Sequence, residues 1–296
     1  MTSTSDEQRS LRGIAPGKIN LHLRITGKRD DGYHLIESLV LPIDLTDEIV
    51  LAPRDDGRLI VHCPALPRLE TDDNLIIKAA RWFFRQFDIP PGEQGADIAL
   101  RKRIPLGAGL GGGSADAATV LRLLEERHGR SLAEAGLLNE TWRIGADVAA
   151  CYTHLPCWVE GIGEIVVEAV ELPKIAILLA NPGFEVSTRW AYEATSSEML
   201  TNVGNDAKRG RRFTDLKEII QVLCNDLEAV TFRKHPVLSE MKGALVECGA
   251  QAAMMTGSGP TIYGLFDRNE QAQDAKDRLA SEWTSWTFWA ASNFVG

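Results

Sequence analysis

The sequence has few cysteines, no long apolar run and no excess of positive charge. The five cysteines form no C-x-x-C pair, which argues against a disulfide framework or a zinc site and favours buried thiols in a reducing compartment. No apolar run is long enough to span a bilayer, and residues 1–10 lack the apolar core of a secretory signal. We therefore expect a cytoplasmic protein with no membrane partner.

The charge balance argues against a nucleic-acid-binding protein. The chain carries 32 lysines and arginines against 41 aspartates and glutamates, a formal net charge of -9, whereas such proteins need a basic footprint. With 44% hydrophobic and 25% charged residues over 296 positions, the composition is that of a globular protein with a sizeable core. We expect no nucleic-acid partner, and a phosphate ligand would need local features to attract it.

Periodicity predicts strands and helices in the first half of the chain. Apolar residues alternate with polar ones over residues 19–25, the period of a half-buried strand. Further strands are expected at Leu35–Asp44, Glu48–Ala52, Arg58–His62 and Asp97–Arg103. Helical spacing predicts helices over Asn74–Phe87 and Ser114–His128, and a capping box predicts the start of another at Ser131–Glu134.

The second half of the chain predicts an α+β layer. Strands are expected at Glu164–Leu172, Ile175–Leu179, Ala252–Met255, Thr261–Phe266 and Trp286–Ala290, and helices at Thr214–Leu223, Pro236–Glu247 and Asn269–Glu282. The polar, basic stretch Leu200–Arg212 predicts a mobile loop. Together the two halves predict an α/β (α+β) protein with domains at residues 1–166 and 167–296 and the active site in the cleft between them.

The most informative segment is the glycine-rich run from Ile104 to Ala115. Five glycines occur within residues 107–113, directly before a helical pattern. Glycine lets the backbone approach a ligand closely and adopt positive φ. A helix N-terminus behind such a loop offers free N–H donors and the positive end of a dipole. The segment therefore predicts a phosphate-binding loop.

Several other glycine loops fit this sequence poorly. Residues 107–112 satisfy G-x-G-x-x-G, but a dinucleotide fold needs an apolar strand before the loop, and here that strand is charged and ends in proline. A P-loop needs a lysine after the glycines, and a protein kinase needs H-R-D and D-F-G motifs, none of which occurs. A turn that binds nothing is disfavoured because five glycines at a helix entry destabilise the free chain.

The run from Pro105 to Ala115 closely resembles the phosphate loop of the GHMP kinases, which phosphorylate small metabolites with ATP. Segments Ala15–Leu21 and Thr256–Pro260 also resemble that family, and the three motifs occur in the family's order over most of the chain. The resemblance implies the two-domain GHMP kinase architecture, with an ATP-binding N-terminal domain and a GHMP-type C-terminal domain. It also implies ATP and Mg²⁺ as cofactors and a small-molecule substrate.

Four further segments are similar to members of this family that act on a cytidine diphosphate-linked methylerythritol in non-mevalonate isoprenoid biosynthesis. These segments are Gly27–His34, Asp73–Ile76, Gly145–Val148 and Glu160–Glu164, and the Gly-Tyr-His of the first is the discriminating element. One departure is Asp116, where some members carry asparagine. Two alternatives are a mevalonate, homoserine or sugar kinase of the same family, and a non-catalytic nucleotide-binding module.

The resemblance assigns catalytic roles to Lys18 and Asp147. Taken alone, Lys18 predicts an exposed structural lysine and Asp147 a helix N-cap. In the resemblance, Lys18 lies near the acceptor hydroxyl, and Asp147 is the general base that takes its proton. Phosphoryl transfer needs mostly positioning and charge stabilisation, so this pair and the loop would suffice. The presence of both residues argues against a non-catalytic module.

The resemblance also implies an ATP site. Asn74 is a helix cap by its sequence position, and the resemblance places it near the nucleotide base. Lys102 could simply solvate its strand, but the family has a lysine there near ATP. Ser114 is expected to cap a helix and to offer its hydroxyl to phosphate or Mg²⁺. The loop residues implied in ATP binding are Pro105, Leu106, Gly107, Ala108, Gly109, Leu110, Gly111, Gly112, Gly113, Ser114 and Ala115.

The resemblance implies a separate site for the phosphate acceptor. Tyr33 and His34, which could also be turn residues packed on the core, are assigned to the cytidine, with His34 bonded to the cytosine. An aromatic platform with an edge-reading donor or acceptor is how a single base is recognised. Tyr192 is the second aromatic for that base, with Trp190 two residues away as the alternative. Asn20 is expected to contact the erythritol end.

Overall fold

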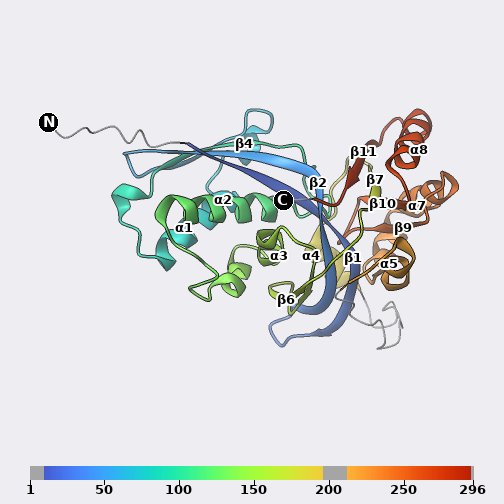
Figure 1. Ribbon diagram of the computed structural model, residues 1–296, viewed down its shortest axis with the longest axis horizontal. Helices are drawn as coiled ribbons and strands as arrows, with labels where there is room; N and C mark the ends of the chain where they lie inside the picture. The colour runs from blue at the N-terminus through green and yellow to red at the C-terminus, as the bar shows by residue number, and fades with distance from the viewer. Residues whose placement is uncertain (1–9, 196–211, 295–296) are drawn as a thin grey trace.

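The computed structural model describes residues 10–195 and 212–294. The N-terminal segment 1–9 and most of the predicted mobile loop Leu200–Arg212 lie outside the described residues. The fold mixes helices and strands, as predicted. The strands form two β-sheets, and the two longest strands, residues 11–28 and 34–53, run from one half of the molecule into the other (Figure 1). Among the described helices, none is long and apolar enough to cross a membrane.

The first sheet has seven strands, in the order β3-β4-β2-β1-β8, with β5 pairing with β2 and β6 with β5. Its longest pair, β1 and β2, is an antiparallel hairpin in which Leu11 faces Leu51. The bounds are β1 Leu11–Lys28, β2 His34–Pro53, β3 Leu59–His62, β4 Ala96–Arg101, β5 Cys157–Glu160, β6 Ile165–Ala169 and β8 Cys224–Asn225.

Two predictions for this sheet are wrong. The strands expected at Leu35–Asp44 and Glu48–Ala52 form the single strand β2. The register between β1 and β2 shifts between Pro16 and Lys18, and the two strands pair on both sides of this shift. The 19–25 strand is not half-buried, since its polar residues Asn20 and His22 are buried as well. Both make hydrogen bonds to protein groups: His22 Nδ1 lies 2.7 Å from the Val222 carbonyl, and Asn20 donates to Ser38.

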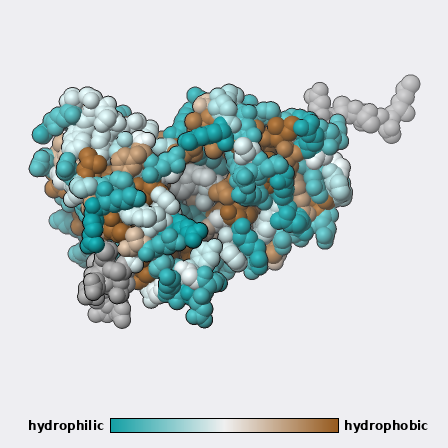
Figure 2. Space-filling view, turned by 180° about the vertical axis from the view of Figure 1, so that it is seen from behind, coloured by the Kyte–Doolittle hydropathy of each residue, from teal (hydrophilic) through white to brown (hydrophobic). Residues whose placement is uncertain are grey.

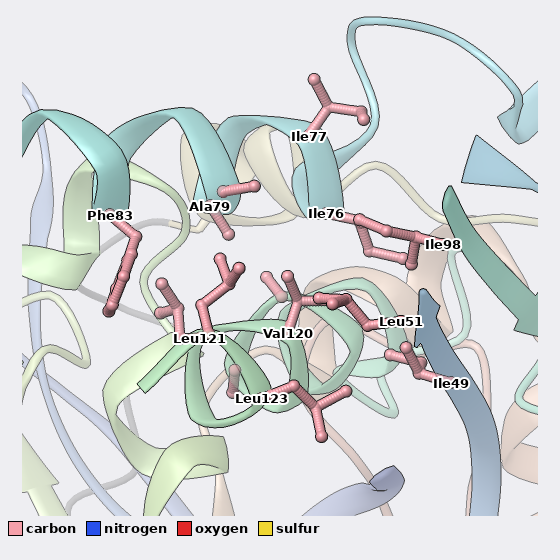
Figure 3. Packing of buried hydrophobic residues seen from close by; sticks show 14 of the residues in the cluster. Ile49, Leu51, Ile76, Ile77, Ala79, Phe83, Ile98, Val120, Leu121 and Leu123 are labelled. Atoms are coloured by element: carbon pink, nitrogen blue, oxygen red, sulfur yellow. The ribbon is translucent and has the colours of Figure 1, made fainter. Parts of the chain in front are cut away.

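Two helices, α1 (Leu75–Gln86) and α2 (Gly112–His128), cover this sheet. Figure 3 shows Ile76, Ala79 and Phe83 of α1 directed toward Val120 and Leu121 of α2, beside strand residues. This packing forms the core of the N-terminal half. The helix predicted to start at Ser114 begins two residues earlier, at Gly112, because Gly111 is its N-cap, with φ 66°.

The expected helix at Ser131–Glu134 does not form. Ser131 Oγ accepts the hydrogen bond from the Glu134 amide that a capping box requires, at 3.2 Å, but residues 132–136 make only turns. The chain continues through short elements: the 3-10 helix η3 (Leu138–Arg143) and α3 (Val148–Thr153). Other 3-10 turns lie at η1 Pro67–Leu69 and η2 Pro91–Glu93.

The second sheet is antiparallel, in the order β11-β7-β10-β9. Its strands are β7 Ala176–Asn181, β9 Ala252–Met255, β10 Ile262–Phe266 and β11 Thr287–Ser292. Helices α7 (Val237–Glu247) and α8 (Asn269–Glu282) pack on it, and α8 has the predicted bounds. The remaining helices are α4 Thr188–Ala194, α5 Leu216–Val222 and α6 Glu228–Lys234, of which only α5 was expected.

The two sheets share a core. Ile19, Leu39 and Leu41 of the first sheet belong to one buried cluster with Ile177 and Tyr263 of the second. Strand β8, from the C-terminal half, also pairs with β1. The domain boundary at residue 166 therefore stays a prediction, and the hairpin β1–β2 joins the two halves. In Figure 2 the rear face is mostly hydrophilic, with hydrophobic residues in separate areas.

Candidate active site

A cavity of about 900 Å³ lies where the glycine loop, the turn after β9, helix α4 and the β1–β2 hairpin meet. Nearly all the residues that the sequence assigned to a site line it. They are Lys18, Asn20, Tyr33, His34, Lys102, residues 105–114, Asp147 and Tyr192. One cavity therefore contains both the expected phosphate loop and the expected acceptor residues.

The glycine loop reaches the cavity in a conformation that requires glycine. Gly107, Gly109 and Gly111 have φ of 58°, 75° and 66°, values that residues with a Cβ rarely adopt. A Cβ on Gly109 would collide with the Thr256 carbonyl, and one on Gly111 would lie 2.8 Å from Lys18 Cγ. The first turn of α2 opens onto the cavity, and its amides have no partner within the helix. The loop can therefore bind an anion at a helix N-terminus.

Lys18 and Asp147 form an ion pair at the edge of this loop. Lys18 Nζ lies 3.4 Å from Asp147 Oδ2, and the lysine is almost fully buried whereas the carboxylate is about one-third exposed. Asp147 occupies the N-cap position of α3, but its side chain makes no capping bond. Its carboxylate is thus directed at Lys18 and the cavity. A role as a structural N-cap alone does not explain this orientation.

Asn20 orients Lys18. Its Oδ1 accepts a hydrogen bond from Lys18 Nζ at 2.7 Å, and its Nδ2 donates to Ser38 Oγ at 2.8 Å. Both polar groups of its side chain therefore bond to protein. Its expected contact with the erythritol stays a prediction.

Thr256 connects this lysine to the glycine loop. Its Oγ1 accepts a hydrogen bond from the backbone N–H of Asn20 at 3.1 Å. The same hydroxyl can donate to the Gly109 carbonyl at 3.2 Å or to Asn20 Oδ1 at 3.3 Å. Asn225 Nδ2 donates to the carbonyls on either side of Thr256, those of Met255 and Gly257. Thr256 belongs to the Thr256–Pro260 motif, which by itself did not indicate this role.

Lys102 lies beneath the loop and is not solvated. Its ammonium donates to Asp47 and Asp116, both at 2.6 Å, and all three side chains are buried. Burial, opposed by the neighbouring ammonium, raises the pKa of Asp116 to about 7. The pKa of Lys102 is also raised, because the attraction of the two carboxylates outweighs its burial. A Cβ on Gly112 would lie 2.9 Å from Lys102 Nζ, so the ammonium supports the loop directly.

Aromatic rings gather at the acceptor end of the cavity. The His34 and Tyr192 rings are stacked with centroids 5.4 Å apart, and Tyr33 is exposed beside them. Burial, followed by the charge of Lys28, lowers the pKa of His34, so its ring is neutral at pH 7. Trp190 does not line the cavity, and Lys234 Nζ lies 3.8 Å from its ring centroid. The geometry therefore favours Tyr192 over Trp190 as the second aromatic.

Two expected residues do not line the cavity, Asn74 and Ala115. Asn74 caps α1, as its sequence position predicts: its Oδ1 accepts from the Ile76 amide and its Nδ2 donates to the Leu69 carbonyl, both at 2.9 Å. Its role toward the nucleotide base stays a prediction. Thr188 and Arg189, which no sequence motif indicated, line the cavity from α4. That helix is too short to give a periodic signal.

Models of the GHMP kinase family match both halves of the chain. The N-terminal domain of GHMP kinases matches residues 74–154, and the C-terminal domain matches residues 205–285. A protein from Syntrophus aciditrophicus named 4-diphosphocytidyl-2-C-methyl-D-erythritol kinase is 37% identical over 93% of this chain and 96% of its own length. Relatives of the same name from Pelobacter propionicus and Paracoccus denitrificans are 38% and 37% identical over 94% and 95% of this chain, and over 97% and 96% of their own.

Solved structures of this family have the same fold. A crystal structure of 4-(cytidine 5'-diphospho)-2C-methyl-D-erythritol kinase has a TM-score of 0.78 and 30% identity, covering 97% of this chain and 100% of its own. A homoserine kinase from Cytophaga hutchinsonii has a TM-score of 0.74 at 18% identity, covering 100% of this chain and 97% of its own. At that identity the second similarity concerns the fold alone.

Proposed function

The chain belongs to the GHMP kinase family, and we propose that it transfers the γ-phosphoryl group of ATP to the 2-hydroxyl of 4-diphosphocytidyl-2-C-methyl-D-erythritol. It is an ATP-dependent small-molecule kinase. The observation that supports this acceptor is the junction of two sites in one cavity: a glycine loop with a lysine–carboxylate pair, and a stacked His34–Tyr192 pair fit for a base. Mevalonate and homoserine have no base to occupy the second site.

We assign the chemistry to the Lys18–Asp147 pair. Asp147 takes the proton of the acceptor hydroxyl as its oxygen attacks the γ-phosphorus. The new O–P bond forms while the bond to the β–γ bridging oxygen breaks, and ADP leaves. Lys18, held by Asn20, orients the hydroxyl and stabilises the transferred group by its charge. The free amides at the start of α2 hold the phosphates of ATP.

The residues present are compatible with Mg²⁺. The Ser114 hydroxyl lines the cavity and makes no hydrogen bond within the described part of the chain. No group of three or more acidic, histidine or cysteine side chains suited to a metal occurs among the described residues. This fits Mg²⁺ in kinases, which usually takes one or two protein ligands, substrate phosphates and waters. Ser114 would hold the ion, which neutralises phosphate charge when bound. The cytoplasmic location stays a prediction.

Replacing His34 tests the acceptor assignment. We expect His34→Ala to weaken binding of cytidine diphosphate by about one to two decades, because a polar group of the base loses its partner. Affinity for a non-hydrolysable ATP analogue should hardly change. Isothermal titration with each ligand measures both effects.

His235→Ala is the matched control, since His235 also stacks on an aromatic ring, that of Phe184, but does not line the cavity. Equal losses for the two ligands, or no loss for either, would contradict the cytidine assignment and leave an unspecified kinase of the family.

A further inference from the structure

The position of the proposed base depends on the short helix α3. Asp147 is the N-cap of this helix, and its carbonyl accepts a helical hydrogen bond from the Cys151 amide at 2.9 Å. The backbone of Asp147 therefore moves with α3. A helix of six residues is too short to be stable by itself. Its orientation, and with it that of the Asp147 carboxylate, must be set by the elements that it contacts.

Helix α3 lies alongside α2, and the chain that leads into α3 contacts the start of α2 (Figure 1). A Cβ on Gly145, two residues before Asp147, would lie 3.3 Å from Ser114 Oγ. Ser114 is in the first turn of α2, to which we assign the phosphates of ATP. The chain just before the base therefore packs against the turn that is proposed to bind phosphate.

A second set of contacts joins the other end of α3 to α2. The Tyr152 hydroxyl donates to Glu125 Oε2 at 2.5 Å, and the Tyr152 carbonyl accepts from Arg122 Nη1 at 3.0 Å. The guanidinium of Arg122 also lies 5.7 Å from the centroid of the Tyr152 ring, within the range of a cation–π interaction. The hydroxyl, the ring and the backbone carbonyl of one tyrosine are thus all bound to α2.

The acceptor of the tyrosine hydroxyl is itself held in place. The other oxygen of Glu125, Oε1, accepts a hydrogen bond from the Leu132 amide. Burial, followed by the hydrogen bond to Glu125, raises the pKa of the Tyr152 phenol, so that it keeps its proton and donates it to this bond at neutral pH. The Tyr152 ring packs against the core of the N-terminal half. Tyr152, Glu125 and Arg122 are not among the described residues that line the cavity, so their effect on the reaction passes through the position of α3.

These contacts attach α3 to α2 at two points, one at the phosphate-binding turn and one farther along the helix. The two points, Ser114 and Arg122, are eight residues apart, about 12 Å along the helix axis. We propose that Tyr152, through its bonds to α2, is a positioning residue that holds Asp147 at a fixed distance from the γ-phosphate of ATP. A misplacement of about 1 Å can cost about 10²-fold in rate. The inference rests on the proposed function and adds to it how the base is oriented toward the nucleotide.

The test measures the rate of phosphoryl transfer itself. Wild type and Tyr152→Phe, which loses only the hydroxyl, are mixed in excess over 4-diphosphocytidyl-2-C-methyl-D-erythritol with saturating ATP and Mg²⁺, and the single-turnover rate is followed by rapid quench. We expect Tyr152→Phe to lower this rate about fivefold or more, because α3 loses one of its attachments. The dissociation constants of a non-hydrolysable ATP analogue and of cytidine diphosphate, measured by calorimetry, should change less than about twofold.

Two further backgrounds show whether the effect passes through Glu125 and Asp147. Glu125→Leu should lower the rate by itself, and Tyr152→Phe should lower it little further in that background, because the hydroxyl has already lost its acceptor. In the Asp147→Asn background, Tyr152→Phe should change the residual rate less than about twofold, since no base remains to be positioned.

Lys242→Met is the matched control for a general loss of stability. Lys242 Nζ donates to Glu228 Oε2 at 2.7 Å and so joins α7 to α6, and neither side chain is among the described residues that line the cavity. Losing this bond should lower the free energy of unfolding in urea, as Tyr152→Phe also should, but it should leave the single-turnover rate unchanged.

The failures are distinguishable. A wild-type rate in folded Tyr152→Phe, or an equal loss of rate in Tyr152→Phe and Lys242→Met, would overturn the positioning role and leave the proposed function intact. A loss of affinity for the ATP analogue as large as the loss of rate, fully additive losses with Glu125→Leu, or an undiminished effect in Asp147→Asn would also overturn it. A wild type that does not phosphorylate the acceptor would overturn the proposed function, and the inference with it.

Discussion

At the scale of single residues, the two members of the Lys18–Asp147 pair have different surroundings. Lys18 is buried and held by Asn20, while Asp147 is partly exposed and makes no capping bond. An ordered ammonium beside an available carboxylate is suited to positioning a hydroxyl, because little side-chain motion remains to be lost. The two residues therefore have different roles. Replacing Asp147 with asparagine removes the basic carboxylate and keeps the shape of the side chain.

Asp147→Asn should lower turnover by roughly 10²–10⁴-fold while ATP binding persists, because the amide cannot accept the hydroxyl proton. Steady-state kinetics and ATP-analogue titration measure the two quantities. Asp215→Asn is the matched control at another helix N-cap, where the carboxylate does bond a backbone amide. Near-normal turnover of folded Asp147→Asn would exclude Asp147 as the base.

Lys102 has a stability role that can be measured separately. Lys102→Met leaves Asp47 and Asp116 buried without a cation, and breaking a buried ion pair on one side costs about 3–5 kcal/mol. We expect urea unfolding to show a loss of this size. Adding Asp116→Asn should recover part of it, because one buried charge is removed. A loss below about 1 kcal/mol for Lys102→Met would contradict this account of the cluster.

At the scale of elements, helix α2 and its glycine loop act together. Gly111 and Gly129 occupy the two ends of α2 with similar φ, 66° and 59°. A Cβ at Gly111 would crowd Lys18, whereas one at Gly129 meets nothing within 4 Å. Substitutions at Gly111 and Gly129 therefore separate the effect of backbone strain from the effect of a side chain placed in the site.

Gly111→Val should weaken ATP binding at least about tenfold with little change in circular dichroism, because the side chain blocks close approach of the phosphates. Gly129→Val should cost comparable backbone strain and leave ATP affinity near that of the wild type. If both variants keep wild-type affinity, the loop is not the phosphate site. If both lose it equally, strain rather than blockage explains the effect.

The sequence predicted those elements whose signals are local. Asn74 caps α1 as expected, and α8 has the predicted bounds, because capping and period act within one turn. The Ser131 capping bond forms without a helix, since a cap alone does not supply a buried face. Strands β5 and β8 were missed because they are short and depend on pairing with β2 and β1.

The site was predictable where a motif carries it. The loop residues, Lys18, Asp147 and His34 line one cavity, as their motifs indicated. The buried position of Lys102 was not predictable, because Asp47 is 55 residues away in the chain. Thr188 was missed for the same reason: its partner Ser258 is distant in sequence, and only the folded chain brings the two hydroxyls together.

At the scale of the whole molecule, buried histidines link stability to pH. His22, His128 and His154 each have a buried Nε2 without a partner among the described residues. Burial lowers the pKa of all three, and that of His154 falls to about 4. The folded pKa thus lies below the unfolded value of about 6.5. Their contribution to stability is present above pH 6.5 and is lost as the pH falls toward 4.

His154→Asn should therefore flatten the acid loss of stability. Asparagine tolerates the positive φ of 55° at this position, so the fold should be kept. We expect the difference in free energy of unfolding between wild type and variant to shrink as the pH is lowered from 7 to 4.5, measured by urea titration. A difference that stays constant over this range would exclude His154 as a source of the pH dependence.

The two halves of the molecule share a core along the β1–β2 hairpin, and this hairpin carries Lys18 and Asn20 to the cavity. His34, at the start of β2, comes from the same hairpin, while Tyr192 comes from the C-terminal half. The hairpin thus contributes the catalytic lysine and one residue of the acceptor end, while the glycine loop and Tyr192 come from other elements. This arrangement suits a kinase that must hold ATP and a long acceptor at a fixed separation.

The central claim is that the acceptor carries a cytidine diphosphate. It is tested most directly by incubating the wild-type protein with ATP and Mg²⁺ and comparing kcat/KM for 4-diphosphocytidyl-2-C-methyl-D-erythritol, mevalonate and homoserine. Phosphorus NMR identifies the hydroxyl that is phosphorylated. We predict a new phosphate on the 2-hydroxyl of the cytidine-linked acceptor, with kcat/KM at least about 10³-fold above the other two, because only that acceptor fills both ends of the cavity. Comparable turnover of mevalonate or homoserine, or no phosphorylation of the cytidine-linked acceptor, would contradict the claim.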